Sequence, residues 1–179
     1  MNKTLVWDPF VRLFHWLLVV GFTLDALFVE DESALHNQIG YGVLALIGLR
    51  LVWGLIGSRH ARFSDFPPSL GGCLRQLAEI ATRRNTPRAG HSPLGALMIY
   101  NLLGAIALIG FTGWMMTTTA YWGVDWVEEV HETLVVWAGA SAIVHVAAVI
   151  FESRRTGVNL PKSMVTGYKT LPDSKKAGQ

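Results

Sequence analysis

The chain has 179 residues, of which 51% are hydrophobic, and its mean hydropathy is +0.34. Soluble domains of this length rarely reach that combination, so a membrane protein is the leading class. The one cysteine, Cys73, excludes a disulfide framework and a cysteine-rich metal site. The formal net charge of +2 says little as a sum, whereas the distribution of the charges along the chain is informative.

Four stretches are apolar enough to cross a membrane. They cover about residues 11–29, 37–57, 94–117 and 131–151, each close to the roughly 20 residues that span about 30 Å of hydrocarbon. We expect the first to be a retained helix rather than a removed signal peptide, because it carries Arg12, His15 and Trp16 and no small-residue cleavage site precedes VEDES. The sequence therefore predicts an all-α membrane protein, with a four-helix transmembrane bundle over residues 1–155 and a tail over 156–179.

The charges predict the orientation of this bundle. All lysines and arginines lie near the start of the first stretch, from the end of the second to the start of the third, or after the fourth. The two other connections, residues 30–33 and 118–129, hold only acidic charges: Glu30, Asp31, Glu32, Asp125, Glu128 and Glu129. By the positive-inside rule, we expect both termini and the 58–93 loop in the cytoplasm and a short acidic surface outside.

Two cytoplasmic segments are expected outside the bundle. Within the 58–93 loop, Leu74, Leu77, Ile80 and Ala81 have helical apolar spacing, which predicts an amphipathic helix of about a dozen residues on the membrane surface. The tail after Arg155 is polar and punctuated by proline and glycine. We expect it to be loosely ordered at its end.

Four of the six histidines fall within the apolar stretches, where ionisable side chains are costly and commonly functional. His15 is early in the first stretch and His145 late in the fourth, so both are expected toward the cytoplasm. His36 opens the second stretch and His131 the fourth, so both are expected toward the outside. The histidines thus form two layers, His15 with His145 and His36 with His131.

The spacing of the two histidines in the fourth stretch suits two stacked cofactors. His131 and His145 are 14 residues apart, which places the rings about 21 Å apart along a helix and within about 40° of one face. This distance is too great for one shared metal centre. It fits two haems, each held by histidines of facing helices, and the absence of a Cys-x-x-Cys-His motif makes them b-type rather than c-type. The alternative is a set of hydrogen-bonded interfacial rings.

Other residues fit the same hypothesis but have simpler interpretations. Arg12 and Arg50 are predicted to pair with propionates of the cytoplasmic haem, although Arg50 can also be a cation extending to the membrane surface. His60 and His91 lie in the polar loop and are expected to be solvated or to face lipid, with a role near the cytoplasmic haem as the alternative. Glycines in the apolar stretches give room for a cofactor or permit close helix packing: Gly40, Gly104, Gly110 and Gly139.

Tryptophans and tyrosines near the ends of the stretches favour an aromatic belt over a quinone site: Trp7, Trp53, Trp114, Tyr121, Trp122 and Trp126.

Several motifs together resemble the bacterial cytochrome b561 family, in particular the b-type subunits of membrane hydrogenases and the cytochromes that pair with periplasmic c-type cytochromes. These motifs are VWDPFVRLFHW, LHNQIGYGVLALIGLRLVWGLIGSRHARFSDF, HSPLGALM and the two histidines of the fourth stretch. The resemblance implies two b haems with bis-histidine ligation, here His15 with His145 and His36 with His131. Hydrogenase subunits of this kind are usually longer, so this chain is more similar to a stand-alone cytochrome or a partner of a di-haem cytochrome c.

The expected function is transmembrane electron transfer in the bacterial inner membrane. Two haems in layers about 21 Å apart would have edges within roughly 10 Å. Electrons would pass between the quinone pool and a periplasmic c-type cytochrome or hydrogenase subunit, steered by the acidic outer loops; no nucleic-acid partner is expected. The alternatives are a self-contained quinone-coupled oxidoreductase, such as a superoxide oxidase, and a haem-free membrane scaffold.

Overall fold

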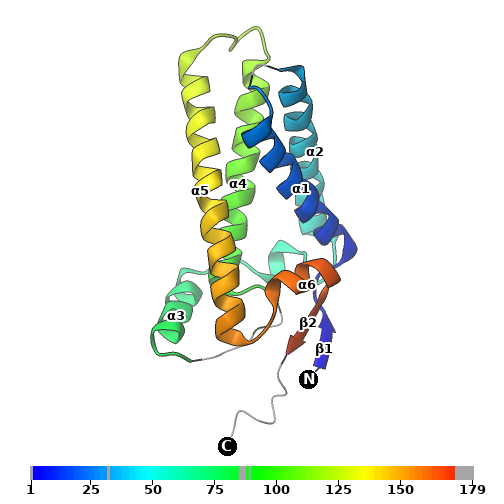
Figure 1. Ribbon diagram of the computed structural model, residues 1–179, viewed down its shortest axis with the longest axis vertical. Helices are drawn as coiled ribbons and strands as arrows, with labels where there is room; N and C mark the ends of the chain where they lie inside the picture. The colour runs from blue at the N-terminus through cyan, green and yellow to red at the C-terminus, as the bar shows by residue number, and fades with distance from the viewer. Residues whose placement is uncertain (1, 32, 85–87, 89, 172–179) are drawn as a thin grey trace, which may run out of the picture.

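Four long helices form the body of the protein (Figure 1). The computed structural model describes residues 2–31, 33–84, 88 and 90–171. The long helices are α1 (Pro9–Phe28), α2 (Ala34–Ile56), α4 (Pro93–Met116) and α5 (Asp125–Thr156). All four are long and apolar enough to cross a membrane, so the expected all-α membrane bundle is confirmed.

The shorter elements lie at one end of the bundle. They are the 3-10 turn η1 (Phe63–Asp65), α3 (Leu70–Ala81), α6 (Leu160–Thr166) and the strands β1 (Asn2–Leu5) and β2 (Tyr168–Leu171). We call this the terminal end, because β1 and β2 lie there (Figure 1). The opposite end, formed by residues 29–33 and 117–124, is called the loop end. The outer-loop residue Glu32 and the tail residues 172–179 lie outside the described part of the chain.

Polar caps start three of the long helices before their apolar stretches begin. The side chains of Asp8, Ser33 and Ser92 accept hydrogen bonds from backbone N–H groups in the first turns of α1, α2 and α4. In α5 the helix begins at Asp125, six residues ahead of the apolar stretch, and acidic residues occupy its first turn. Negative charge there favours the positive end of the helix dipole. His131 is therefore well inside α5 rather than at its start.

Helix α4 makes most of the contacts between the long helices, whereas the side of α5 that faces α1 and α2 is sparsely packed. Helix α4 packs against both α2 and α5, and α1 packs against α2. The core centres on Ile47, Leu103, Ile106 and Ala138. In contrast, α5 makes no extended contact with α1 or α2 among the described residues. Only 11% of the most apolar window of α1 and of α5 is buried, so most of their apolar surface is free to meet lipid or a cofactor.

Hydrogen bonds between side chains also link the helices. Asn101 of α4 donates through Nδ2 to Ser141 Oγ of α5 at 2.9 Å and accepts from Trp137 Nε1 at 3.0 Å. Nearer the loop end, the Tyr41 and Thr117 hydroxyls of α2 and α4 are 2.9 Å apart. Such bonds contribute about 0.6 kcal/mol each on average between membrane helices, so they fix helix register more than they add stability.

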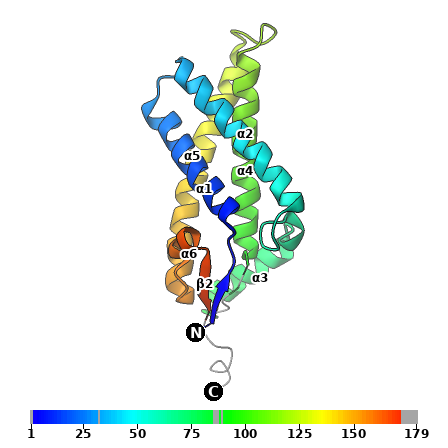
Figure 2. The ribbon, with the colours of Figure 1, turned by 90° about the vertical axis from the view of Figure 1, so that its right-hand side faces the viewer.

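The two ends of the chain pair beneath the bundle. Strands β1 and β2 are antiparallel, with Asn2 opposite Leu171 and Leu5 opposite Tyr168. Trp7, just after β1, is 6% exposed and donates through Nε1 to Ser163 Oγ of α6 at 3.2 Å. Figure 2 shows α6 and both strands together beside the lower end of α5. Trp7 is therefore not part of an aromatic belt, and the tail folds against the start of the chain as far as residue 171.

The expected helix in the 58–93 loop is present as α3. Gln76 is buried, and its Oε1 accepts a hydrogen bond from the backbone N of Leu94 at 3.0 Å, which ties α3 to the start of α4. On the other side, Leu70, Leu74 and Leu77 are exposed. This apolar face is available to contact a membrane surface.

Candidate functional site

The helices bring His36 and His131 together near the loop end. His36 is in the first turn of α2, where its backbone N donates to the Ser33 cap at 3.1 Å. His131 of α5 faces α4, and Gly113 of α4 makes room for it, since a Cβ at that position would lie 3.2 Å from the ring. The two ring centroids are 6.4 Å apart and the ring planes meet at 71°.

Each of these rings uses its Nδ1 atom to contact a different helix. His36 Nδ1 is 3.2 Å from Asp25 Oδ1 of α1. His131 Nδ1 is 2.9 Å from Thr112 Oγ1 of α4. The Thr112 hydroxyl also lies within hydrogen-bond distance of the Leu108 and Ile109 carbonyl oxygens. Because its single proton is directed to a carbonyl, this hydroxyl accepts a hydrogen bond from the imidazole.

These contacts favour a proton on Nδ1 of both rings. The Asp25 carboxylate can only accept, although the 3.2 Å contact with His36 Nδ1 is not aligned as a hydrogen bond. Thr112 accepts from His131 Nδ1 when its own proton is directed to a carbonyl oxygen. The Nε2 atoms then keep a lone pair, and neither has a hydrogen bond within the described residues. A neutral imidazole with Nδ1–H bound to a second group is the usual form of a metal-ligating histidine.

The separation of the two rings fits coordination from opposite sides. Imidazoles that bind one metal ion in this way, through bonds of about 2 Å, have centroids roughly 6 Å apart, and the observed value is 6.4 Å. A Cβ added at Gly40, one turn beyond His36, or at Gly139 would meet nothing within 4 Å. Together with the sparse contact between α5 and α2, this leaves space for a large planar ligand.

His15 and His145 occupy α1 and α5 closer to the terminal end. The two rings are near enough to interact electrostatically. His15 Nδ1 is buried and has no hydrogen-bond partner within the described residues. No carboxylate acts on either ring in that part of the chain, which distinguishes this pair from His36 and His131.

Arg12 and Arg50 both keep a buried guanidinium nitrogen without a partner. Arg50 is 3% exposed, donates through Nη2 to the Ala61 carbonyl oxygen at 3.0 Å and lies 4.9 Å from the centroid of the Phe63 ring. Its Nη1 atom and the Nε atom of Arg12 are buried without a hydrogen bond among the described residues. Arg50 is therefore not an extended surface cation, and both arginines have donors available for an anionic group.

The model of one protein family, described as prokaryotic cytochrome b561, matches residues 6–167. The chain belongs to the prokaryotic cytochrome b561 family. No curated protein and no solved structure matches the chain. As a member of the cytochrome b561 family with four apolar helices, it is a multi-pass membrane protein that binds b-type haem and transfers electrons across the membrane.

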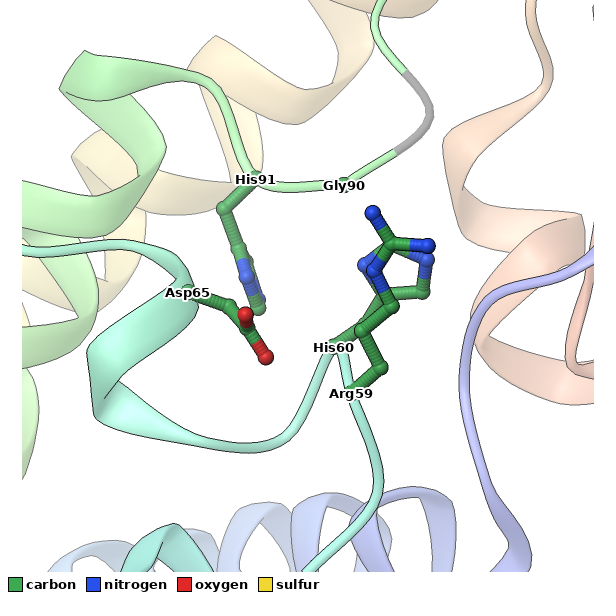
Figure 3. A pocket seen from close by; sticks show the side chains of 5 residues that line it. All are labelled: Arg59, His60, Asp65, Gly90 and His91. Atoms are coloured by element: carbon green, nitrogen blue, oxygen red, sulfur yellow. The ribbon is translucent and has the colours of Figure 1, made fainter.

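The cytochrome also has a polar cavity of about 250 Å³ at the terminal end. Its lining consists of Arg59, His60, Asp65, Gly90 and His91. Figure 3 shows the side chains of Arg59 and His60 on one side of the cavity and those of Asp65 and His91 on the other. Both loop histidines therefore belong to one site in the fold, although they are 31 residues apart in sequence (91 − 60).

His91 differs from the solvated or lipid-facing residue that the sequence suggested. Its ring packs against those of Trp7 and Phe66, with centroid distances of 4.6 and 4.2 Å and ring planes tilted by 49° and 48°. Burial, helped by the positive charges of Lys169 and Arg50, lowers the pKa of His91 to about 3. Burial also lowers the pKa of His60. The tail and the start of the chain enclose His91, and the sequence did not show that contact.

Lys169 of β2 contacts both the loop before α4 and the start of the chain. Its Nζ donates to the Gly90 carbonyl oxygen at 2.9 Å and lies 5.0 Å from the centroid of a Trp7 ring. Burial lowers the pKa of Lys169 to about 8. This cation ties Gly90 to β2, and it is the first of the positive charges that act on His91.

Asp8 joins the terminal ends of α1 and α2. Burial alone would raise its pKa, but hydrogen bonds from Ser58, the backbone N of Val11 and Trp53 Nε1 hold the pKa of Asp8 below its ordinary value. The Trp53 bond is 3.1 Å long. Trp53 is thus anchored to α1, which fixes where α2 leaves the bundle.

The sequence interpretation missed Asp25 and Thr112 altogether. Asp25 is the acidic residue inside the first apolar stretch, and an ionisable side chain in such a stretch is a functional candidate by default. That signal was available in the sequence. Thr112 carried no comparable signal, because threonine is common in membrane helices and its contact with His131 depends on the packing of α4 against α5.

Proposed function

We propose that this cytochrome carries electrons across the bacterial inner membrane through two b haems, one held by His36 and His131 and the other by His15 and His145. The observation that carries the proposal is the separation of 6.4 Å between the His36 and His131 rings. The Nδ1 atom of His36 faces a carboxylate at 3.2 Å, and that of His131 is hydrogen-bonded to a hydroxyl. When bound, haem would supply a one-electron couple, and ligation by two histidines would leave oxygen no position on the iron.

The arginines support a second haem nearer the terminal end. Arg12 is one turn before His15, and Arg50 enters the buried region from α2. The unpartnered guanidinium nitrogens of both residues are suited to haem propionates, because a buried cation requires an anionic or hydrogen-bonding partner. These side chains would neutralise and orient the acidic edge of the cofactor.

The sidedness of the cytochrome follows from charge. The terminal end carries the lysines and arginines of residues 59–88 and 154–169, so it is proposed to face the cytoplasm. The loop end carries the exposed acids Glu30, Asp31, Asp125, Glu128 and Glu129 and is proposed to face the periplasm. Quinone or quinol is the proposed membrane partner.

The acidic loop end favours a protein partner over superoxide. A basic surface around the exposed haem edge of a periplasmic c-type cytochrome, or of a hydrogenase subunit, would be attracted to these carboxylates. Superoxide is an anion and would be repelled by the same field. The self-contained superoxide oxidase is therefore the less favoured alternative.

Stopped-flow oxidation of the reduced cytochrome by a basic c-type cytochrome tests this function. At low salt we expect fast oxidation that slows as ionic strength rises, because salt screens the attraction. Replacing Asp125, Glu128 and Glu129 by their amides should slow the reaction roughly tenfold at low salt and little at high salt. Asp65→Asn at the terminal end is the matched control and should have no effect.

Two results would contradict the proposal. One is equal oxidation rates for the triple variant and the unaltered cytochrome at low salt. The other is oxidation by superoxide that is faster than oxidation by the c-type cytochrome, which would favour the superoxide oxidase instead.

A further inference from the structure

A carboxylate inside the membrane-spanning part of α1 faces one of the proposed haem ligands. Asp25 Oδ1 and His36 Nδ1 are 3.2 Å apart, and the two side chains are 15% and 23% exposed respectively. A carboxylate at this depth in an apolar helix is costly unless it has a partner. The contact with His36 accounts for its position.

The two atoms are in contact with each other but are not aligned. They lie 3.2 Å apart, both are buried, and neither forms an aligned hydrogen bond to the other or to any further group within the described residues. The titratable groups near Asp25 are His36, His131 and Asp31, with no lysine or arginine among them. The carboxylate therefore has imidazole rather than a cation as its partner, and a small rotation of the His36 ring would align the Nδ1–H with Oδ1.

The proposed haem ligands consequently differ in their second contacts. His36 has a carboxylate and His131 has the Thr112 hydroxyl, whereas no carboxylate acts on His15 or His145 in the described part of the chain. A carboxylate bound to the Nδ1–H of a ligating imidazole makes that imidazole a stronger electron donor to the metal. Stronger donation stabilises the oxidised metal and lowers its reduction potential.

We infer that Asp25 is a positioning residue that fixes the His36 ring through its Nδ1–H and makes the loop-end haem the lower-potential one of the two. The inference rests on the proposed bis-histidine haems. Asp25 keeps Nε2 of His36 directed at the metal and increases the negative charge on the ring. At the other end, the buried cation Arg50 and the partly buried cation Arg12 favour reduction. Electrons entering at the loop end are thus favoured to move toward the terminal end.

Redox titration of Asp25→Asn, followed by the haem absorption bands, tests this inference. Asparagine keeps the size and an acceptor oxygen but removes the negative charge. We expect two haems per chain, an upward shift in the midpoint potential of the loop-end haem and no shift for the other haem. The electron paramagnetic resonance signal of the oxidised loop-end haem should change as well, since it reports the donor strength of the axial imidazole.

Two further variants show which haem changes its potential and whether the charge of Asp25 in particular causes the change. In the His145→Ala background only the loop-end haem should remain, and Asp25→Asn should shift its potential upward there too. Asp65→Asn is the matched control, because it makes the same change at an exposed carboxylate outside the membrane-spanning helices. It should leave both potentials close to those of the unaltered cytochrome.

The outcomes separate this inference from the proposed function. If His36→Ala and His131→Ala each remove one haem but Asp25→Asn leaves both potentials unchanged, or shifts both equally, the role of Asp25 is wrong and the haem ligation stands. If His36→Ala and His131→Ala both retain two haems, the proposed ligation itself is wrong.

Discussion

At the terminal end, the imidazole of His91 is kept neutral by its surroundings. The rings of Trp7 and Phe66 enclose it, and Lys169 adds a positive charge nearby. Three segments that are distant in sequence thus meet around one side chain. Protonating this ring in place is unfavourable, so acidification should open the contact between the tail and the bundle.

The pH dependence of this contact can be predicted with its sign. The pKa of His91 is about 3 in the folded protein against an ordinary value of 6.5, so between these values the opened form binds the additional proton. The free energy of opening should therefore fall by about 1.4 kcal/mol for each pH unit below 6.5. Hydrogen exchange of residues 160–171 from pH 7 to pH 5, corrected for intrinsic rates, measures it.

Substitutions distinguish His91 from other titrating groups. His91→Phe should remove most of this pH dependence, whereas His60→Gln, which alters the other histidine of the same cavity, should keep most of it. An unchanged pH dependence in His91→Phe would show that other groups control the opening.

Much of the candidate site could be predicted from residue types alone, but the prediction for Trp7 was wrong and Asp25 was missed. The four histidines stood out because imidazole is rare in apolar stretches, and their two layers followed from helix geometry. Trp7 was assigned to a membrane interface, since nothing in its neighbourhood showed that α6 would cover it. Asp25 could have been found by the same argument as the histidines, because it is also ionisable and within a span.

At the scale of elements, the long helices were predictable and the tail was not. The four helices follow from the length and hydropathy of their sequences, and α3 from its apolar spacing. Strands β1 and β2 are four residues each, too short and too polar for a recognisable alternation. They form because the fold brings the chain ends together, which no local pattern specifies.

Helix α2 offers a direct test of the space beside α5. A Cβ at Gly40 or at Gly42 would meet nothing within 4 Å, so both positions tolerate a larger side chain in the bare bundle. Gly40 lies one turn from His36, whereas Gly42 is exposed on another face of α2. If the space near His36 belongs to a haem, Gly40→Leu should reduce loop-end haem to roughly half or less by overpacking.

Gly42→Leu is the matched control, with the same change in volume on the same helix. It should keep the full haem content, measured by the pyridine haemochrome spectrum of the purified protein. Full haem in Gly40→Leu, or equal losses in both variants, would be inconsistent with a haem seated against that face of α2.

At the scale of the whole molecule, the arrangement joins two charged surfaces through an apolar bundle. Helix α5 extends from the acidic loop end to the basic terminal end and carries a histidine at each of two levels. Helix α4 packs against α5 and α2, so it fixes the distance across which His36 and His131 face each other. The order of charges along the sequence was sufficient to propose sidedness. The separation of the two histidines required the packed structure.

The haem content of four single variants, His15→Ala, His36→Ala, His131→Ala and His145→Ala, tests the central claim most directly. The unaltered cytochrome should bind two b haems per chain, and each variant should bind one. His36→Ala and His131→Ala should lose the same component of the redox titration, and His15→Ala and His145→Ala the other. A single haem in the unaltered protein, or different components lost by His36→Ala and His131→Ala, would contradict the account.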